Sequence, residues 1–235
     1  LEKLVYNDRE DAVKILADLV EDKILGIDKV WPSHFLIRLM ELKKGISFVN
    51  GSPIMDEVRM IKDEEEIRLM KEASAINDKV MAEAIELVKQ GYDERKVCKL
   101  LADVYEKYET YSFSFYPLIA YGANAAEPHH SSDSTAIQEG DSVILDIGGL
   151  TKGYCSDMTR TVFYKKVSQE AELVYNLVLE ANRKGIEAVK PGVRLCEIDK
   201  AAREVIEKAG YGKYFTHRTG HNIGVEVHEF PDVSS

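Results

Sequence analysis

Cysteine is scarce in this sequence, and no cysteine lies in a disulfide or metal-binding pattern. The three cysteines, Cys98, Cys155 and Cys196, are odd in number and lack the Cys-x-x-Cys spacing of thiolate zinc sites. They indicate free thiols in a reducing compartment, so we expect a cytoplasmic location. The sequence also lacks an apolar run as long as a transmembrane helix and a signal-peptide pattern.

Positive charge is scarce relative to negative charge. The 31 Lys and Arg residues against 41 Asp and Glu residues give a net charge of −10, and no Lys/Arg cluster reverses it locally. This balance disfavours a nucleic acid or an anionic membrane as partner. With 45% hydrophobic and 31% charged residues, the composition is that of an ordinary globular protein. Its 235 residues suffice for one large domain, or one domain and part of another.

Three common catalytic motifs are missing as well. The helical zinc motif HExxH does not occur, and Gly220 and Gly224 weaken a helix around the histidines. No Gly-x-Ser-x-Gly elbow occurs, which disfavours a Ser-His-Asp triad. Gly148-Gly149 is not followed by a helical pattern, so a phosphate loop is disfavoured too.

What the sequence does contain is a pair of aspartates, Asp146 and Asp157, on two predicted strands. A hairpin turn centred between Thr151 and Lys152 would place them directly opposite each other. Opposed residues have Cβ atoms about 4.5–5.5 Å apart, where two carboxylates repel unless one is protonated or a cation lies between them. A salt bridge from Arg160 to Asp157 is the alternative, although strand alternation puts these two residues on opposite faces.

Histidines favour the metal interpretation. His34 is interpreted as an ordinary surface or core residue, whereas the other five lie between residues 129 and 228. Neutral imidazole and carboxylate are the usual ligands of Zn, Mn, Co or Fe. His221 is predicted to begin a strand, and alternation puts His228 on its other face unless Gly224 forms a bulge. The five clustered histidines are His129, His130, His217, His221 and His228.

The chain divides into a short and a long segment. Residues 1–60 alternate strand, helix and strand, as in the tail of a small α/β domain. Residues 61–235 contain two helix–Gly–helix segments, which a shift of 101 residues aligns. This pattern predicts a duplicated helix–helix–sheet unit with a site between its halves. The four helices are predicted to begin after the caps Asp63 and Asp93, at Ser168 and near Leu195.

Three separated motifs resemble the proline-specific branch of the pita-bread metallopeptidases. They are Asn124–His129, Asp146–Gly149 with Ser156–Thr161, and His217–Glu229, and the resemblance spans about residues 55–235. It implies an α+β fold in which a duplicated helix–helix–sheet catalytic domain, residues 61–235, is incomplete at its C-terminus. Residues 1–60 would be the remnant of an N-terminal α/β domain.

The resemblance also implies a site and a reaction. Asp146, Asp157 and His221 would hold two divalent metal ions, with Mn or Co favoured by the ligand types and Zn or Fe as alternatives. His129 and His228 would be catalytic and His217 would bind substrate. A metal-bridged water would hydrolyse the peptide bond preceding proline in a small peptide with proline in second position. Related enzymes form homodimers, which is the expectation here.

Several alternatives remain beside this interpretation. Xaa-Pro dipeptidase (prolidase) and Xaa-Pro aminopeptidase are both open. A methionine aminopeptidase-like enzyme is disfavoured by residues 1–60, and creatinase by the retained metal ligands. A non-catalytic binding module on the same fold is disfavoured by the intact site residues. The chain begins at Leu1 rather than Met, and two further glutamate ligands are implied beyond Ser235. We therefore expect a chain that is truncated at both ends and is weakly active or inactive by itself.

Overall fold

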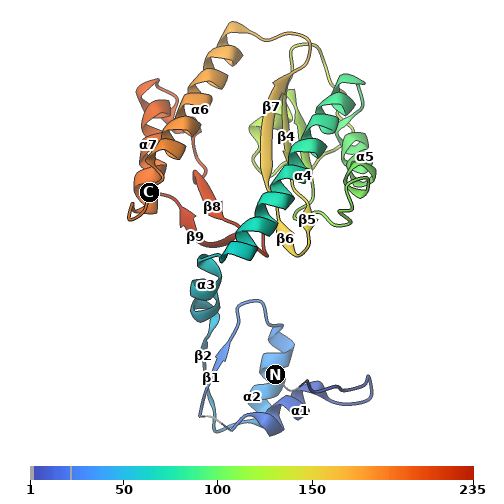
Figure 1. Ribbon diagram of the computed structural model, residues 1–235, viewed down its shortest axis with the longest axis vertical. Helices are drawn as coiled ribbons and strands as arrows, with labels where there is room; N and C mark the ends of the chain where they lie inside the picture. Colours follow the sequence, from blue (N-terminus) through green and yellow to red (C-terminus); the bar gives the residue numbers. More distant parts are fainter. Residues whose placement is uncertain (1–2, 22) are drawn as a thin grey trace. The chain divides into compact units, whose positions relative to one another are not determined.

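The computed structural model describes residues 3–21 and 23–235. The chain forms two compact units, the first ending at Arg59 and the second beginning at Met60 (Figure 1). Each unit has its own buried core. All the predicted site residues lie in the second unit.

The first unit has the strand–helix–strand order expected from the sequence. Its two strands are parallel, with Ile24 opposite Ser47, and helix α2 connects them. The core of this unit forms around Val13, Ala17 and Leu39. The sequence pattern predicts a helix over residues 11–20, a strand over 24–28, a helix over 34–43 and a strand over 46–49. Each lies within one residue of the observed bounds: α1 (Ala12–Leu19), β1 (Ile24–Ile27), α2 (Ser33–Leu42) and β2 (Ser47–Asn50), followed by α3 (Ser52–Met60).

The second unit contains two helix pairs. Helix α4 begins with a capping box, in which Asp63 accepts from Glu66 N while Asp63 N donates to the Glu66 side chain, as its sequence predicts. Asp93 caps α5 as predicted, and Ser168, predicted as the first residue of the next helix, is the N-cap of α6. Helices α6 and α7 pack against each other, and α4 lies across the hairpin of β4 and β7 (Figure 1). The pairs are α4 (Glu64–Lys89) with α5 (Glu94–Glu106), and α6 (Gln169–Ala188) with α7 (Leu195–Lys208).

A three-stranded antiparallel sheet in the order β3-β4-β7 accompanies the first pair, and a two-stranded sheet of β8 and β9 accompanies the second. In β4 the alternate residues Val143, Leu145 and Ile147 are fully buried in the core with α4 and α5, which turns Asp146 to the opposite face. The strands are β3 (Leu118–Tyr121), β4 (Ser142–Ile147), β5 (Leu150–Thr151), β6 (Tyr154–Cys155), β7 (Met158–Phe163), β8 (Gly220–Asn222) and β9 (Glu229–Val233). Two short 3-10 helices, η1 (Gly122–Ala126) and η2 (Gly212–Tyr214), complete the unit.

The predicted register of the hairpin is wrong by two residues. Asp146 pairs with Thr159, not with Asp157. The turn is Lys152-Gly153, both with positive φ (51° and 86°), so its centre lies one residue later than predicted. Positive φ at both central residues matches the right-handed twist of a two-residue hairpin, and glycine favours it. Because a shift of two preserves the alternation, Asp157 still belongs to the face of Asp146 and Thr159.

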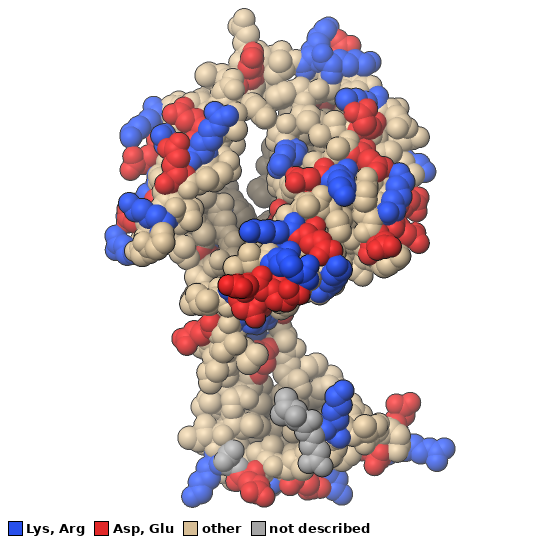
Figure 2. All heavy atoms as spheres, viewed as in Figure 1, with Lys and Arg blue, Asp and Glu red and all other residues tan. Residues whose placement is uncertain are grey.

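Surface charges of both signs are interspersed on the face drawn in Figure 2, and no broad basic surface is visible there. Within the part of the chain that is described, no helix is both long and apolar enough to cross a membrane.

Candidate metal centre

All six predicted site residues line one cavity of about 670 Å³ in the second unit. This volume is in the range of small-ligand sites. The cavity lies over the polar face of β4 and β7, beside the segment that leads into β8. The predicted residues in its lining are His129, Asp146, Asp157, His217, His221 and His228.

Asp157 and His221 are close together in this cavity. The Oδ2 atom of Asp157 lies 3.4 Å from Nε2 of His221, and these side chains are 25% and 17% exposed. His221 Nδ1 lies 3.0 Å from the carbonyl oxygen of Asn222. Because a carbonyl only accepts, Nδ1 carries a hydrogen, which leaves Nε2, on the side of the carboxylate, as the ring nitrogen available to a cation.

The surroundings of Asp146 and Asp157 favour a bound cation, because they destabilise the charged form of both carboxylates. Burial raises the pKa of Asp146 above its usual range; a hydrogen bond from Thr159 Oγ1 (2.8 Å) opposes this, and the charge of Asp157 adds to it. Burial also raises the pKa of Asp157, against the effect of His221. A protonated His221 could pair with Asp157 but would leave Asp146 without a full counter-charge. Two carboxylates and one imidazole suit a divalent cation.

Three further histidines surround these ligands. The ring centroids of His221 and His228 are 4.2 Å apart, and those of His129 and His217 are 6.0 Å apart. The expectation of opposite faces for His221 and His228 is wrong, because β8 ends at Asn222 and the chain bends before Glu229. The irregularity in the β8–β9 pairing falls between His221 and Asn222 rather than at Gly224. Burial lowers the pKa of His228, with smaller contributions from His221 and Arg218.

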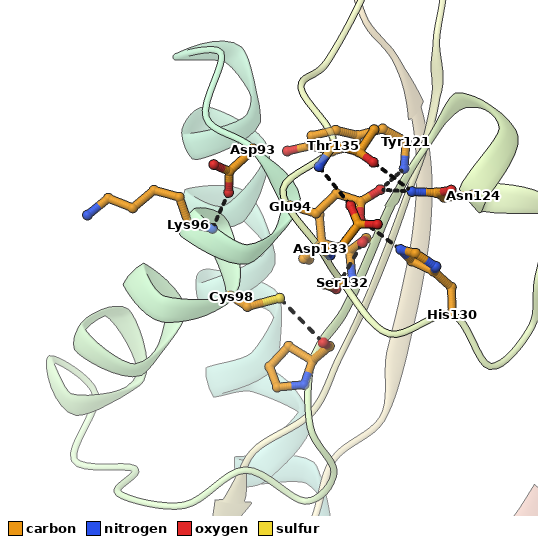
Figure 3. A network of polar contacts seen from close by, with 12 residues as sticks. Asp93, Glu94, Lys96, Cys98, Tyr121, Asn124, His130, Ser132, Asp133 and Thr135 are labelled. Carbon is orange, nitrogen blue, oxygen red and sulfur yellow. Dashed lines mark hydrogen bonds and ion pairs between the residues drawn. The ribbon is translucent and has the colours of Figure 1, made fainter.

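The segment that carries His129 is folded around the N-terminus of α5. The amides of Glu94 and Arg95 donate to the carbonyl oxygens of Thr135 and Asp133. The Glu94 side chain is fully buried and lies among polar groups of the same segment, as Figure 3 shows.

Glu94, His130 and Asp133 form the one group of three acidic or histidine residues, within the described chain, whose ligand atoms all lie within 4.8 Å of one another. The predicted set of Asp146, Asp157 and His221 is more open. Each oxygen of Glu94 already accepts two hydrogen bonds, from Tyr121 N and Asn124 Nδ2 on one side and from His130 Nε2 and Asp133 N on the other. A metal there would have to displace these donors, so we interpret the group as a hydrogen-bond network.

A second buried carboxylate holds the segment that carries His217 and His221. Asp199 of α7 accepts from Thr219 N (3.2 Å), Thr219 Oγ1 (2.5 Å) and Ser235 N (3.1 Å). It also pairs with Arg203, whose other donors reach the carbonyl oxygens of Phe215 and His217.

Sequence reasoning missed Glu94, Asp199 and Arg218. Glu94 follows the helix cap Asp93, where an acidic residue is expected simply from the helix dipole. Asp199 belongs to an amphipathic helix pattern in which a charged residue is usually exposed. Arg218 lies inside the histidine motif and lines the cavity, which its proximity to His217 and His221 could have signalled.

The sequence pattern of metallopeptidase family M24 matches residues 68–235. The chain belongs to this family. The resemblance assigned some residues of this cavity to metal binding or catalysis, and all of them lie within the matched range.

Individual relatives extend over nearly the whole chain. A candidate dipeptidase of Bacillus subtilis (strain 168), YkvY, is 35% identical over 237 residues, which cover 97% of this chain and 65% of the relative. The crystal structure of a recombinant prolidase from Thermococcus sibiricus superposes with a TM-score of 0.93 at 36% identity, covering 99% of this chain and 65% of that one. An X-Pro aminopeptidase from Thermotoga maritima gives a TM-score of 0.84 at 30% identity, covering 96% of this chain and 65% of that one.

These similarities confirm the predicted family and the fold class with mixed helices and sheets. The chain spans about 65% of the length of these relatives. The similarity includes both dipeptidase and aminopeptidase structures, so it supports a metal-dependent peptidase without separating these two substrate classes.

Proposed function

We propose that the protein containing this chain is a dinuclear metallopeptidase that hydrolyses the peptide bond preceding proline, in Xaa-Pro dipeptides or at the N-terminus of Xaa-Pro peptides. The convergence of Asp146, Asp157 and His221 with His129 and His228 in one cavity carries this proposal. A binding module without activity would have no chemical need for such a set.

Asp146, Asp157 and His221 would hold the metal ions, for which oxygen and imidazole ligands favour Mn or Co. Bound divalent ions would supply activation of a water molecule and polarisation of the peptide carbonyl. Thr159 orients Asp146 by donating to its Oδ1. The carbonyl oxygen of Asn222 orients the ring of His221 so that Nε2 is available to a cation.

The remaining histidines would act on the substrate. Because the pKa of His228 is lowered, its ring is neutral at pH 7 and can accept a proton from a polar group of the peptide. His129 and His217 face each other on the cavity wall, where His129 would contact the scissile bond and His217 the rest of the peptide.

Hydrolysis of an Xaa-Pro dipeptide and an Xaa-Pro-Yaa tripeptide by a version of the protein as long as its relatives tests this proposal. We expect cleavage before proline only with added Mn or Co, and a loss of about 100-fold or more in Asp157→Asn, because loss of a ligand costs at least as much as loss of its supporting residue. The matched control is Asp103→Asn, an exposed residue of α5. If the wild-type protein binds no metal, the binding module is favoured instead. Full activity of the Asp157→Asn variant would favour it too.

We also propose that the first unit is the tail of an N-terminal domain, because it has a parallel strand–helix–strand core of its own. Three cysteines without disulfides, Cys98, Cys155 and Cys196, support a cytoplasmic location.

A further inference from the structure

The Glu94 carboxylate is a fully buried charge whose hydrogen bonds all go to one segment. Its side chain is 0% exposed. The four donors are Tyr121 N at 2.8 Å, Asn124 Nδ2 at 3.0 Å, His130 Nε2 at 2.7 Å and Asp133 N at 3.0 Å. These donors lie on both sides of His129 in the sequence. Figure 3 shows them converging on Glu94 from the segment between Tyr121 and Thr135.

This arrangement requires a carboxylate rather than another polar group. A carboxylate only accepts hydrogen bonds and has about four lone-pair sites, which matches four donors. A glutamine of the same shape would turn an NH₂ group toward one of these two pairs of partners. Each pair contains a backbone N–H, Tyr121 N or Asp133 N, which cannot accept a hydrogen bond and would be left unpaired in a buried place. An unpaired buried group costs about 1–3 kcal/mol, more than the average hydrogen bond contributes.

In the second half of the unit, a buried carboxylate on helix α7 likewise accepts hydrogen bonds from a neighbouring segment. Asp199 is 0% exposed and accepts hydrogen bonds from N and Oγ1 of Thr219 and from the guanidinium group of Arg203. Arg203 donates in turn to the carbonyl oxygens of Phe215 and His217. The segment fixed in this way ends at Thr219, two residues before His221. Neither Glu94 nor Asp199 lines the cavity.

We propose that Glu94 and Asp199 are positioning residues that act separately on the two walls of the site. Glu94 sets the place of His129, and Asp199 sets the place of His217 and His221. The expected effect on turnover rests on the proposed function, whereas the placement of the two segments by Glu94 and Asp199 does not. Since His221 is a proposed ligand and His129 is not, Asp199 should govern metal affinity, whereas Glu94 should govern the turnover of metal-loaded protein.

The isosteric variants Glu94→Gln and Asp199→Asn, each the matched control of the other, test this in a version of the protein as long as its relatives. Loss of a supporting residue typically costs about 10–100-fold in activity or metal affinity. We expect kcat to fall by that factor in Glu94→Gln with KM and Mn affinity near wild type. In Asp199→Asn we expect Mn affinity, measured by calorimetry, to fall by the same factor.

Hydrogen–deuterium exchange of the metal-free protein supplies a second readout, which needs neither substrate nor metal. Faster exchange should be confined to residues 121–135 in Glu94→Gln and to residues 215–221 in Asp199→Asn. If either variant fails to fold, Asn124→Ala or Thr219→Val, each of which removes one donor, takes its place.

The outcomes separate this inference from the proposed function. Wild-type protein that cleaves no Xaa-Pro peptide would end the proposed function, while the exchange pattern would still decide the positioning roles. Unchanged exchange in both segments, or equal acceleration of both segments in each variant, would overturn the inference. So would a loss of Mn affinity in Glu94→Gln as large as that in Asp199→Asn.

Discussion

Arg218 is the only arginine among the described residues that line the cavity. Its Nε is buried without a hydrogen-bond partner, and its Nη1 lies 3.4 Å from Asp232 Oδ2. A guanidinium group binds a carboxylate through two parallel hydrogen bonds. The free carboxylate of an Xaa-Pro dipeptide lies on the proline itself, close to the scissile bond, whereas that of a tripeptide lies one residue further away.

Under the proposed function, Arg218→Met should therefore affect hydrolysis of these two peptides differently. A hydrogen bond to a charged group contributes about 1.5–3 kcal/mol, so we expect KM for an Xaa-Pro dipeptide to rise by about tenfold or more. Hydrolysis of an Xaa-Pro-Yaa tripeptide should change much less. Arg160→Met is the matched control, since Arg160 is exposed on β7 and does not line the cavity. Equal losses on both substrates would refute a carboxylate-binding role.

At the scale of elements, the hairpin that carries both aspartates depends on a glycine after β4. A Cβ atom at Gly148 would lie 2.1 Å from the carbonyl oxygen of Ser156 and 2.2 Å from Ser114 Oγ. Overpacking of this kind costs about 1–3 kcal/mol, so Gly148→Ala should lower the free energy of unfolding by that amount.

Urea unfolding followed by far-UV circular dichroism measures this change, because the single tryptophan, Trp31, reports on the first unit instead. The matched control is Gly45→Ala, where a Cβ atom would have no neighbour within 4 Å. An unfolding free energy equal in both variants would contradict the close approach at Gly148.

The same hairpin shows what local pattern could predict at this scale. The bounds of β4, Ser142–Ile147, follow from its apolar run and are confirmed. The register is wrong because turn chemistry at Lys152 and Gly153, and not the apolar pattern, sets the centre of the hairpin. The prediction that Asp146 and Asp157 share a face of the sheet did not depend on this error, because a shift of two residues leaves the direction of each side chain unchanged.

At the scale of the whole molecule, Asp199 links stability to pH. Burial alone would raise its pKa, but hydrogen bonds from Arg203, Thr219 and Ser235 outweigh burial and hold the pKa well below its usual range. A lowered pKa contributes stability in full above the unfolded value of about 3.9, and this contribution is lost as pH falls below it toward the folded value. Wild-type protein should lose roughly 2 kcal/mol more than Asp199→Asn between pH 5 and pH 2, by the usual linkage for such a shift.

Urea unfolding at several pH values between 2 and 6 checks this expectation. Asp103→Asn, on the exposed surface of α5, should follow the wild-type curve. Parallel curves for wild type and Asp199→Asn would show that the hydrogen bonds to Asp199 do not stabilise its charged form.

Most helices and strands, and six of the residues that line the cavity, could be predicted from the sequence. Helix caps such as Asp63 and the alternation of β4 act over a few residues, so they are visible without a fold, and all six predicted site residues do line one cavity. Their individual roles remain proposals. The contact between the rings of His221 and His228, and the burial of Glu94 and Asp199 among hydrogen-bond donors, depend on the tertiary structure. Glu94 lies 27 residues from Tyr121, and Asp199 lies 20 residues from Thr219, so no local pattern relates them. Whether a helix acid is exposed or buried depends on which segment the fold packs against it.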